Sequence, residues 1–234
     1  MKALNLEVVS GNRSETIQFK VERMINAGYV GRDRQAVVDH IKELSKEGVP
    51  PPPSVPMIFP VLCQNITTAD KIEVVGRKTS GEAEFALLLN SSGVFVAVGS
   101  DHTDRDIERH SIIKSKQICP NVISKQVWNY DDVKSGWDDL ILQSKVTKAD
   151  GGETILYQKA PLESIISATE LMELVKSKMI DDLADGLVIF SGTLPVLTDE
   201  IIYGSHFRCE LIDQRKDRFL ACEYQINILD YLKA

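Results

Sequence analysis

Apolar and polar residues alternate along two stretches near the start of the chain. These stretches are ALNLEVVS, residues 3–10, and TIQFKVER, residues 16–23, and the turn-forming GNRSE lies between them. Successive side chains of a strand point to opposite faces, so alternation predicts strands with one buried face. We therefore expect two early strands that form a hairpin.

A helical period replaces this alternation between residues 33 and 48. Asp33 can cap the helix and Gly48 can end it. The apolar stripe consists of Val37, Val38, Ile41 and Leu44. Residues 49–56, VPPPPSVP, then predict an extended connector, because prolines lack the N–H that a helix or sheet needs. We place a boundary here, between an N-terminal arm (1–49) and a main body (50–234).

The body contains many short β-type runs and only two more helical patterns. The runs are MIFPVL, KIEVV, EFALLL, VFVAVG, DLILQSKV, ETILYQK, GLVIFSG and HFRCELID. One helix is expected around residues 103–114, and another after a capping box formed by Ser167 and Glu170. This order predicts an α+β fold, with a β-rich body and a few short helices.

Composition narrows the possible partners. The chain has 234 residues, 43% hydrophobic and 26% charged, with a net charge of -7. These are globular values, and the negative charge argues against nucleic acid and against a polybasic membrane patch. The four cysteines fit no zinc spacing, and there is neither an apolar leader nor a run long enough to cross a bilayer. We expect reduced thiols, a cytoplasmic location and a small-molecule or protein partner.

Three carboxylates are predicted to meet on one hairpin. EFALLL and VFVAVG flank the turn NSSG, and pairing Asn90 with Gly93 places Glu84 opposite Gly99 and Glu82 opposite Asp101. Opposed residues share a face, with Cβ atoms ~4.5 to 5.5 Å apart. Two charges 5 Å apart repel by roughly 3 kcal/mol at an effective dielectric constant of ~20.

Several features can compensate this repulsion. Protonation, flanking arginines or a bound cation would each do so, and oxygen ligands suit Mg²⁺, Mn²⁺ or Ca²⁺. A solvated Glu-x-Glu face with Asp101 as a helix cap is the plain structural alternative, and a register shift of one residue would point Asp101 elsewhere. Arg105 has a structural alternative as well, as a surface ion-pair partner of Asp101 or Asp104.

Three linked motifs carry a family resemblance. EAEFALLL, then VFVAVGSDHTDRDIER and much later GLVIFSGTLP resemble, in order and spacing, motifs of the fumarylacetoacetate hydrolase superfamily from about Pro56 to Asp213. That superfamily has a Glu-x-Glu strand, a following aspartate in an NDxSxRD-like segment and a TGTP-like loop. The resemblance implies a mixed β-sandwich or roll, and places this chain near a mostly uncharacterised bacterial branch.

The resemblance also implies a metal site and a substrate pocket. Glu82, Glu84 and Asp101 would hold a divalent cation, usually Mg²⁺ or Mn²⁺, with Ca²⁺ as a substitute in crystals. Arg105 and Lys116 would line the pocket, as would Gly192 and Thr193 of SGTLP. The identification of Lys116 is weaker than that of Arg105, because Lys114 lies two residues away.

Superfamily members often carry a His-x-x-Glu pair on an N-terminal lid helix, and this chain has His40 and Glu43 in DHIKEL. A spacing of three places both on one side of the helix, where Glu43 can orient the imidazole. The alternative is a half-buried histidine on a helix that merely docks. The approach GRDRQAVVDH is three residues longer than the family's GRNY-like one, and Glu108 replaces a glutamine of several relatives.

The combined hypothesis is a metal-dependent hydrolase that cleaves a C–C bond in a 2,4-dioxo acid or related β-dicarbonyl compound. His40, oriented by Glu43, would activate water, and Lys116 would stabilise the resulting enolate. Decarboxylation, hydration or isomerisation of an oxo acid on the same site is the alternative chemistry. A non-catalytic carboxylate-binding protein is the alternative of another class. The resemblance further implies a homodimer.

The remaining histidines and the tryptophans have no such motif around them. His102, His110 and His206 are interpreted as surface or loop residues. Trp128 and Trp137 are interpreted as core or interface anchors.

Overall fold

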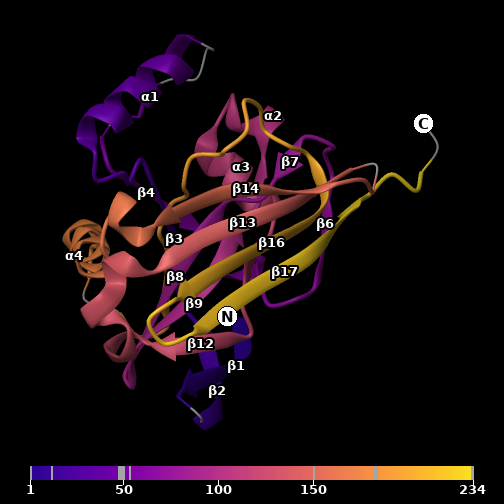
Figure 1. Ribbon diagram of the computed structural model, residues 1–234. Coiled ribbons are helices and arrows are strands. Elements are labelled where there is room, and N and C mark those ends of the chain that lie inside the picture. Colours follow the sequence, from indigo (N-terminus) through magenta and orange to yellow (C-terminus); the bar gives the residue numbers. More distant parts are fainter. Residues whose placement is uncertain are drawn as a thin grey trace.

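The computed structural model describes residues 2–11, 13–46, 51–52, 54–149, 151–181 and 184–232, and its long strands form two sheets (Figure 1). The larger, ten-stranded sheet has the order β2 (Arg13–Val21), β1 (Lys2–Ser10), β12 (Gln126–Asn129), β9 (Gly93–Asp101), β8 (Ala83–Asn90), β15 (Leu187–Phe190), β3 (Arg23–Gly28) and β4 (Met57–Val61). β11 (Asn121–Ile123) pairs with β9 and with β5 (Ile66–Thr67). The five-stranded sheet has the order β14 (Thr154–Pro161), β13 (Ile141–Lys148), β16 (Gly204–Asp213), β17 (Arg218–Ile228) and β6 (Lys71–Val74). β7 (Thr79–Ser80) pairs with β10 (Thr103–Asp104).

Helices are short and lie around the sheets. They are α1 (Arg34–Lys46), α2 (Arg105–Glu108), α3 (Ile112–Ile118) and α4 (Ala168–Lys178), with single 3₁₀ segments at Cys63–Asn65, Tyr130–Asp132, Lys134–Asp139 and Leu162–Ser164. Asp33 caps α1 as predicted, because its Oδ1 accepts from the N–H groups of Gln35 and Ala36 at 3.0 Å. Figure 1 shows α1 projecting from the rest of the chain. Among the described residues, every helix is too short or too polar to span a membrane.

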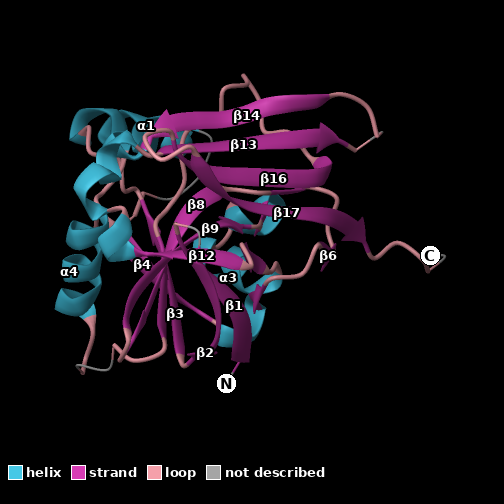
Figure 2. Cartoon of the chain, turned by 60° about the horizontal axis from the view of Figure 1, so that its bottom comes forward, coloured by secondary structure: helices cyan, strands magenta, loops and turns pink. Residues whose placement is uncertain are grey.

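The larger sheet curls, so β8 is buried on both faces. On one face of β8, Phe85 packs in a core that includes Tyr224 of the five-stranded sheet. On the other face, the inner side of the curl, Leu88 packs with Phe19. Figure 2 shows β13, β14, β16 and β17 running across β1 and β3. This arrangement confirms the predicted fold class, an α+β fold with a β-rich mixed sandwich or roll.

Several elements agree with the sequence patterns and others differ. The β1–β2 hairpin and the α4 capping box are present, and Trp128 and Trp137 are buried in the core. The single helix expected over 103–114 is instead the separate helices α2 and α3, because Ser111 has an extended backbone and begins α3. The boundary at residue 49 stays a prediction. β3, from the predicted arm, lies between β15 and β4.

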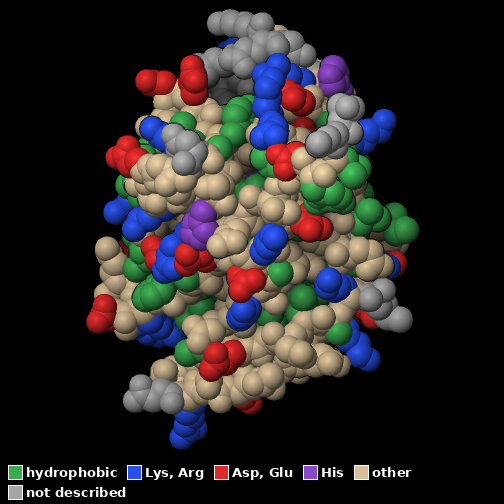
Figure 3. Space-filling model, turned by 90° about the vertical axis from the view of Figure 1, so that its right-hand side faces the viewer, with side chains coloured by type: hydrophobic (Ala, Val, Ile, Leu, Met, Phe, Trp, Pro, Cys, Tyr) green, Lys and Arg blue, Asp and Glu red, His purple; other side chains and the backbone are tan. Residues whose placement is uncertain are grey.

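Charged groups of both signs are interspersed on the face shown in Figure 3. On the exposed side of the five-stranded sheet, for example, Arg208 lies between Glu210 and Glu223 and pairs with both. These surface pairs contribute little stability individually. The buried charges described below are therefore the ones that need a separate explanation.

Candidate metal centre

The β8–β9 hairpin has the predicted register. Asn90 pairs with Gly93 and Glu84 with Gly99, and the N–H of Asp101 donates to the carbonyl of Glu82 at 3.2 Å. Side chains alternate along each strand, so Glu84 and Asp101 both point to the inner side of the curled sheet. The turn residues thus determine where both carboxylates lie.

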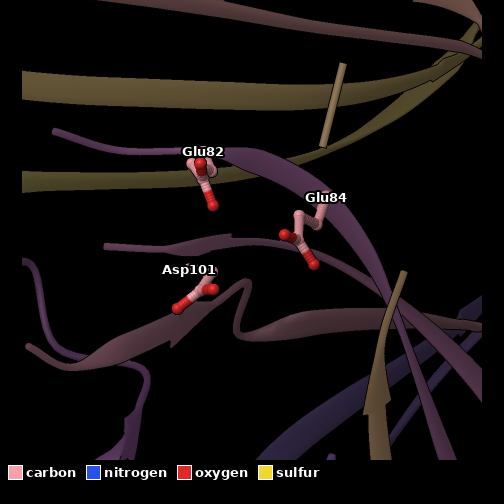
Figure 4. Close-up of side chains that lie close together, drawn as sticks. All are labelled: Glu82, Glu84 and Asp101. Carbon is pink, nitrogen blue, oxygen red and sulfur yellow. The ribbon is translucent and has the colours of Figure 1, made fainter. Parts of the chain in front are cut away.

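Glu82, Glu84 and Asp101 lie side by side (Figure 4). One carboxylate oxygen of each lies within 4.8 Å of those of the other two, and in the part of the chain that the structure describes no other group of three His, Cys, Asp or Glu does this. Asp101 is 0% exposed and Glu84 is 1% exposed. The predicted cluster of carboxylates is therefore present, with Glu84 and Asp101 buried and Glu82 partly exposed.

Two cations from the following helices neutralise part of this charge. Lys116 of α3 contacts Asp101 Oδ2, and its Nζ lies 3.6 Å from Glu82 Oε2. Arg105, at the start of α2, places Nη2 2.9 Å from Glu82 Oε1 and Nη1 2.8 Å from Glu108 Oε2. The predicted alternative partners of Arg105 were wrong, because Asp101 pairs with Lys116 and Asp104 caps α2.

Of the three carboxylates, Glu84 is the one whose negative charge is compensated least by neighbouring groups. Its Oε2 accepts the Gly192 N–H at 2.8 Å, whereas its buried Oε1 has no hydrogen-bond partner. Burial, followed by the charge of Asp101, raises the pKa of Glu84 well above its ordinary value. Protonation is thus a second form of compensation, beside the two cations.

The neighbouring charges respond to the same burial in different ways. Burial works to raise the pKa of Glu82, but Arg105 and Lys116 outweigh it and hold that pKa below its ordinary value. For Lys116, burial works to lower the pKa, yet Asp101 and Glu82 raise it. Lys116 therefore remains a cation at neutral pH and is unsuited to act as a base.

Gly192 and Thr193 lie beside Glu84, but both already have hydrogen-bond partners. Gly192 has a φ of +85°, which directs its N–H to Glu84. The Thr193 hydroxyl donates to the Ala83 carbonyl at 2.9 Å and accepts from Gln158 Nε2 at 2.8 Å. Their predicted substrate contacts stay predictions, and their visible contacts support the strand that carries Glu84.

Sequence patterns missed two amides beside Asp101. Asn121 donates from Nδ2 to Asp101 Oδ1 at 3.3 Å, and Asn26 lies close enough to lower the pKa of that carboxyl against the larger opposing effect of burial. Both asparagines are 0% exposed. A polar residue within a short apolar run such as NVI was the available signal for Asn121.

The histidines give a mixed result. His40 and Glu43 belong to α1, but their side chains lie outside the described part of the structure, so the lid hypothesis stays a prediction. The interpretation of His102 as a surface or loop residue was wrong. It is 0% exposed, and burial, with Arg105 adding to the effect, lowers its pKa to about 3.

The arrangement can hold a divalent cation. Three carboxylates provide the oxygen ligands that such ions prefer, and the partnerless Oε1 of Glu84 lies among them. The two flanking cations could also bind a carboxylate ligand, because both remain charged. Roles for these residues in catalysis stay predictions.

Comparison with solved structures identifies proteins of the same fold. Cg1458 with inhibitor matches with a TM-score of 0.65 and 20% identity, over 93% of this chain and 83% of that chain. The apo form of 2-keto-3-deoxy-D-arabinonate dehydratase matches with 0.63 and 15%, over 94% and 78%. Its complex with magnesium and 2,5-dioxopentanoate matches with 0.61 and 16%, over 93% and 77%. At these identities the likeness shows the fold alone.

Comparison with curated proteins found no match. A family model does match most of the sequence, from residue 27 to residue 224, and thus includes every residue of the carboxylate cluster and its cations. The chain therefore belongs to the family DUF2848, which is described as a protein of unknown function.

Proposed function

We propose that this chain is a divalent-metal-dependent enzyme of the fumarylacetoacetate hydrolase superfamily that acts on a small 2-oxo acid. The observation that carries the proposal is the largely buried cluster of Glu82, Glu84 and Asp101, with one partnerless oxygen on Glu84. A buried polar atom without a partner is costly, so a fold that retains one among three carboxylates points to a ligand. The solved dehydratase that binds magnesium and a dioxo acid in the same fold supports this choice.

The donor set fits Mg²⁺ or Mn²⁺, since it consists only of carboxylate oxygens. Glu82, Glu84 and Asp101 would hold the ion, which, when bound, would supply Lewis-acid polarisation of the substrate's 2-oxo group. Arg105 is the group best placed to bind the substrate carboxylate, because its guanidinium remains charged beside the cluster. Lys116 would stabilise negative charge that develops on the substrate oxygen.

Our first candidate reaction is hydrolytic cleavage of a C–C bond in a 2,4-dioxo acid. Such a reaction needs a base that activates water, and His40, oriented by Glu43, is the proposed group. Lys116 and Arg105 are firmly protonated, and the neutral His102 is enclosed by Tyr224 and Thr79. None of these three residues is suited to be the base, so we assign that role to His40 of α1.

Dehydration of a 2-oxo acid is the second candidate, and the dehydratase of the same fold favours it. The products separate the two reactions, because hydrolysis cleaves a C–C bond whereas dehydration releases water and leaves the carbon chain intact. Hydrolysis should fall at least about 100-fold in His40→Ala, because its base is lost. Steady-state assays with a 2,4-dioxo acid and with a 3-deoxy-2-oxo acid make the comparison.

The proposal is tested first by calorimetric titration of Mn²⁺ into chelator-treated protein, with and without oxalate as a mimic of a 2-oxo acid enolate. We expect binding that oxalate strengthens, and loss of binding in Glu82→Gln. Glu210→Gln is the matched control, because Glu210 has a similarly low side-chain exposure (14% against 13%) and also pairs with an arginine, yet lies on the outer face. Retained affinity in Glu82→Gln would contradict the assignment.

A panel of 2-oxo and 2,4-dioxo acids then tests for turnover. A metal-dependent product supports the enzyme and excludes a purely carboxylate-binding protein. Binding of Mn²⁺ and oxalate with no product from any of these acids would favour the binding protein instead.

A further inference from the structure

The residues on both sides of Asp101 are tied to one hydroxyl group of the other sheet. Ser100 and His102 point away from the carboxylate cluster, as the alternation of a strand requires. Tyr224 of β17 meets both of them: its hydroxyl lies 2.8 Å from Ser100 Oγ and 3.0 Å from His102 Nδ1. The backbone that carries Asp101 is therefore held at two points.

The same network continues to Glu82 and to β7. Ser100 Oγ accepts the backbone N–H of Glu82 at 3.1 Å, and His102 Nε2 lies 2.9 Å from Thr79 Oγ1. Tyr224, Ser100 and His102 are each 0% exposed, so water does not compete for these bonds. Two of the three carboxylate-bearing residues are thus connected to the Tyr224 hydroxyl.

The Glu82 N–H donates to Ser100, and the other three bonds have one common direction, either from Ser100 through Tyr224 and His102 to Thr79 or the reverse. In both cases one ring nitrogen of His102 is a donor and the other is an acceptor, as in a neutral imidazole.

Packing alone does not explain these polar groups. Tyr224 lies in an aromatic cluster with Phe207, at 5.7 Å between ring centroids, where a phenylalanine would fill nearly the same volume. Burying a hydroxyl and an imidazole is costly unless each has partners. The two partners of the Tyr224 hydroxyl, Ser100 and His102, are the residues on either side of Asp101, and Ser100 also accepts the Glu82 N–H.

We propose that Tyr224 and His102 are positioning residues, which fix the spacing of Glu82 and Asp101 for metal binding from the far side of β9. The proposal rests on the proposed function, because it concerns the same metal site. Groups that orient metal ligands typically change metal affinity 10–100-fold when they are removed. Tyr224 and His102 would act through the strand backbone and contact neither metal nor substrate.

The test is Mn²⁺ affinity and the electron paramagnetic resonance spectrum of bound Mn²⁺ in Tyr224→Phe. We expect a Kd about 10-fold higher and a changed spectrum, because the ligand oxygens are no longer held at one spacing. Tyr130→Phe is the matched control, since it also removes a hydroxyl with a 3.0 Å hydrogen bond, to Thr169, from a tyrosine that packs on an aromatic side chain. It should retain the wild-type Kd and spectrum.

An unchanged Kd and spectrum in Tyr224→Phe would overturn the inference, as would equal losses in both tyrosine variants. If Tyr224→Phe does not fold, Thr79→Val removes the other end of the network, and we expect a Kd about 3-fold higher or more. A wild-type affinity in that variant would likewise overturn the inference. If wild-type protein binds no Mn²⁺, the proposed function itself fails, which is a separate outcome.

Discussion

Glu84 lies buried in β8, with one carboxylate oxygen on the Gly192 N–H and the other without a partner. Burial and the charge of Asp101 raise its pKa in the folded state. A raised folded pKa contributes stability below the unfolded pKa, and this contribution is lost as the pH rises through the folded pKa. Glu84→Gln should therefore raise the free energy of unfolding of metal-free protein at high pH, by about 1–3 kcal/mol. Urea denaturation of chelator-treated protein across pH measures this effect, which should vanish near pH 4.5.

Glu82→Gln provides the comparison of opposite sign. Arg105 and Lys116 overcome burial and lower the pKa of Glu82, so its charged form stabilises the fold above the unfolded pKa. This variant should lower the free energy of unfolding at neutral pH, and the loss should shrink as the pH falls through the folded pKa. Shifts in the same direction for both variants would contradict the assignment of charges in the site.

Gly192 is constrained both by its backbone angle and by its surroundings. A Cβ atom there would lie 2.7 Å from Val30 Cγ2 and 3.0 Å from the Ala27 carbonyl. Gly192→Ala should therefore cost more than the ~1 kcal/mol of a positive φ alone, and should move the N–H away from Glu84. Gly11→Ala is the control for the backbone term, because Gly11 has a φ of +57° and open space around it. Equal losses of unfolding free energy in the two variants would show that the contact is unimportant.

At the level of residues, the sequence was informative where a local rule applied. The turn at Asn90 to Gly93 determined the register, and the register located the three carboxylates. Lys116 could not be separated from Lys114 in this way, because only the packing of α3 shows which side chain is buried beside Asp101. The link from His102 to Tyr224 joins residues 122 positions apart, and no local pattern predicts it.

At the level of elements, long alternating runs with clear turns were predictable. The strand β17 was nevertheless missed, although Leu220, Cys222 and Tyr224 alternate with more exposed residues along it. That alternation was available in the sequence. Its pairing with β6, by contrast, depends on contacts between distant segments, which local propensity does not specify.

The helix α1 permits a test of the proposed lid as an element. Asp33 accepts from the N–H groups of Gln35 and Ala36, so Asp33→Ala should cost the helix about 0.5–2 kcal/mol. Because α1 projects from the sheets, we expect faster amide hydrogen exchange within residues 34–46 and little change in global unfolding. Ser167→Ala, which removes the cap of α4, is the matched control. It should accelerate amide hydrogen exchange in residues 168–178 alone. A loss of the same size in the free energy of global unfolding, or unaltered exchange in α1, would contradict this view.

At the level of the whole molecule, the candidate site joins parts that are distant in sequence. Glu84 lies in β8 and Glu82 directly before it. Asp101 ends β9, and the Gly192 N–H comes from the segment after β15. Arg105 and Lys116 belong to two separate helices. The homodimer implied by the resemblance stays a prediction, and light scattering that shows a monomer would contradict it.

Metal binding should therefore stabilise the whole fold. A ligand that binds only the folded state adds about 2.7 kcal/mol at 100 times its Kd. For a domain of this size, that gain corresponds to a rise in Tm of about 5 to 10 °C. Scanning calorimetry of chelator-treated protein, with and without Mn²⁺, measures the shift.

Glu84→Gln sharpens this experiment, because it is expected to stabilise the metal-free protein and yet to abolish the Mn²⁺-dependent rise. Glu210→Gln should retain the rise, since its carboxylate lies outside the cluster. Opposite effects of one substitution on metal-free stability and on metal response would be difficult to explain by packing. An equal rise in Tm for the wild type and Glu84→Gln would place the Mn²⁺ elsewhere on the molecule and exclude Glu84 as a ligand.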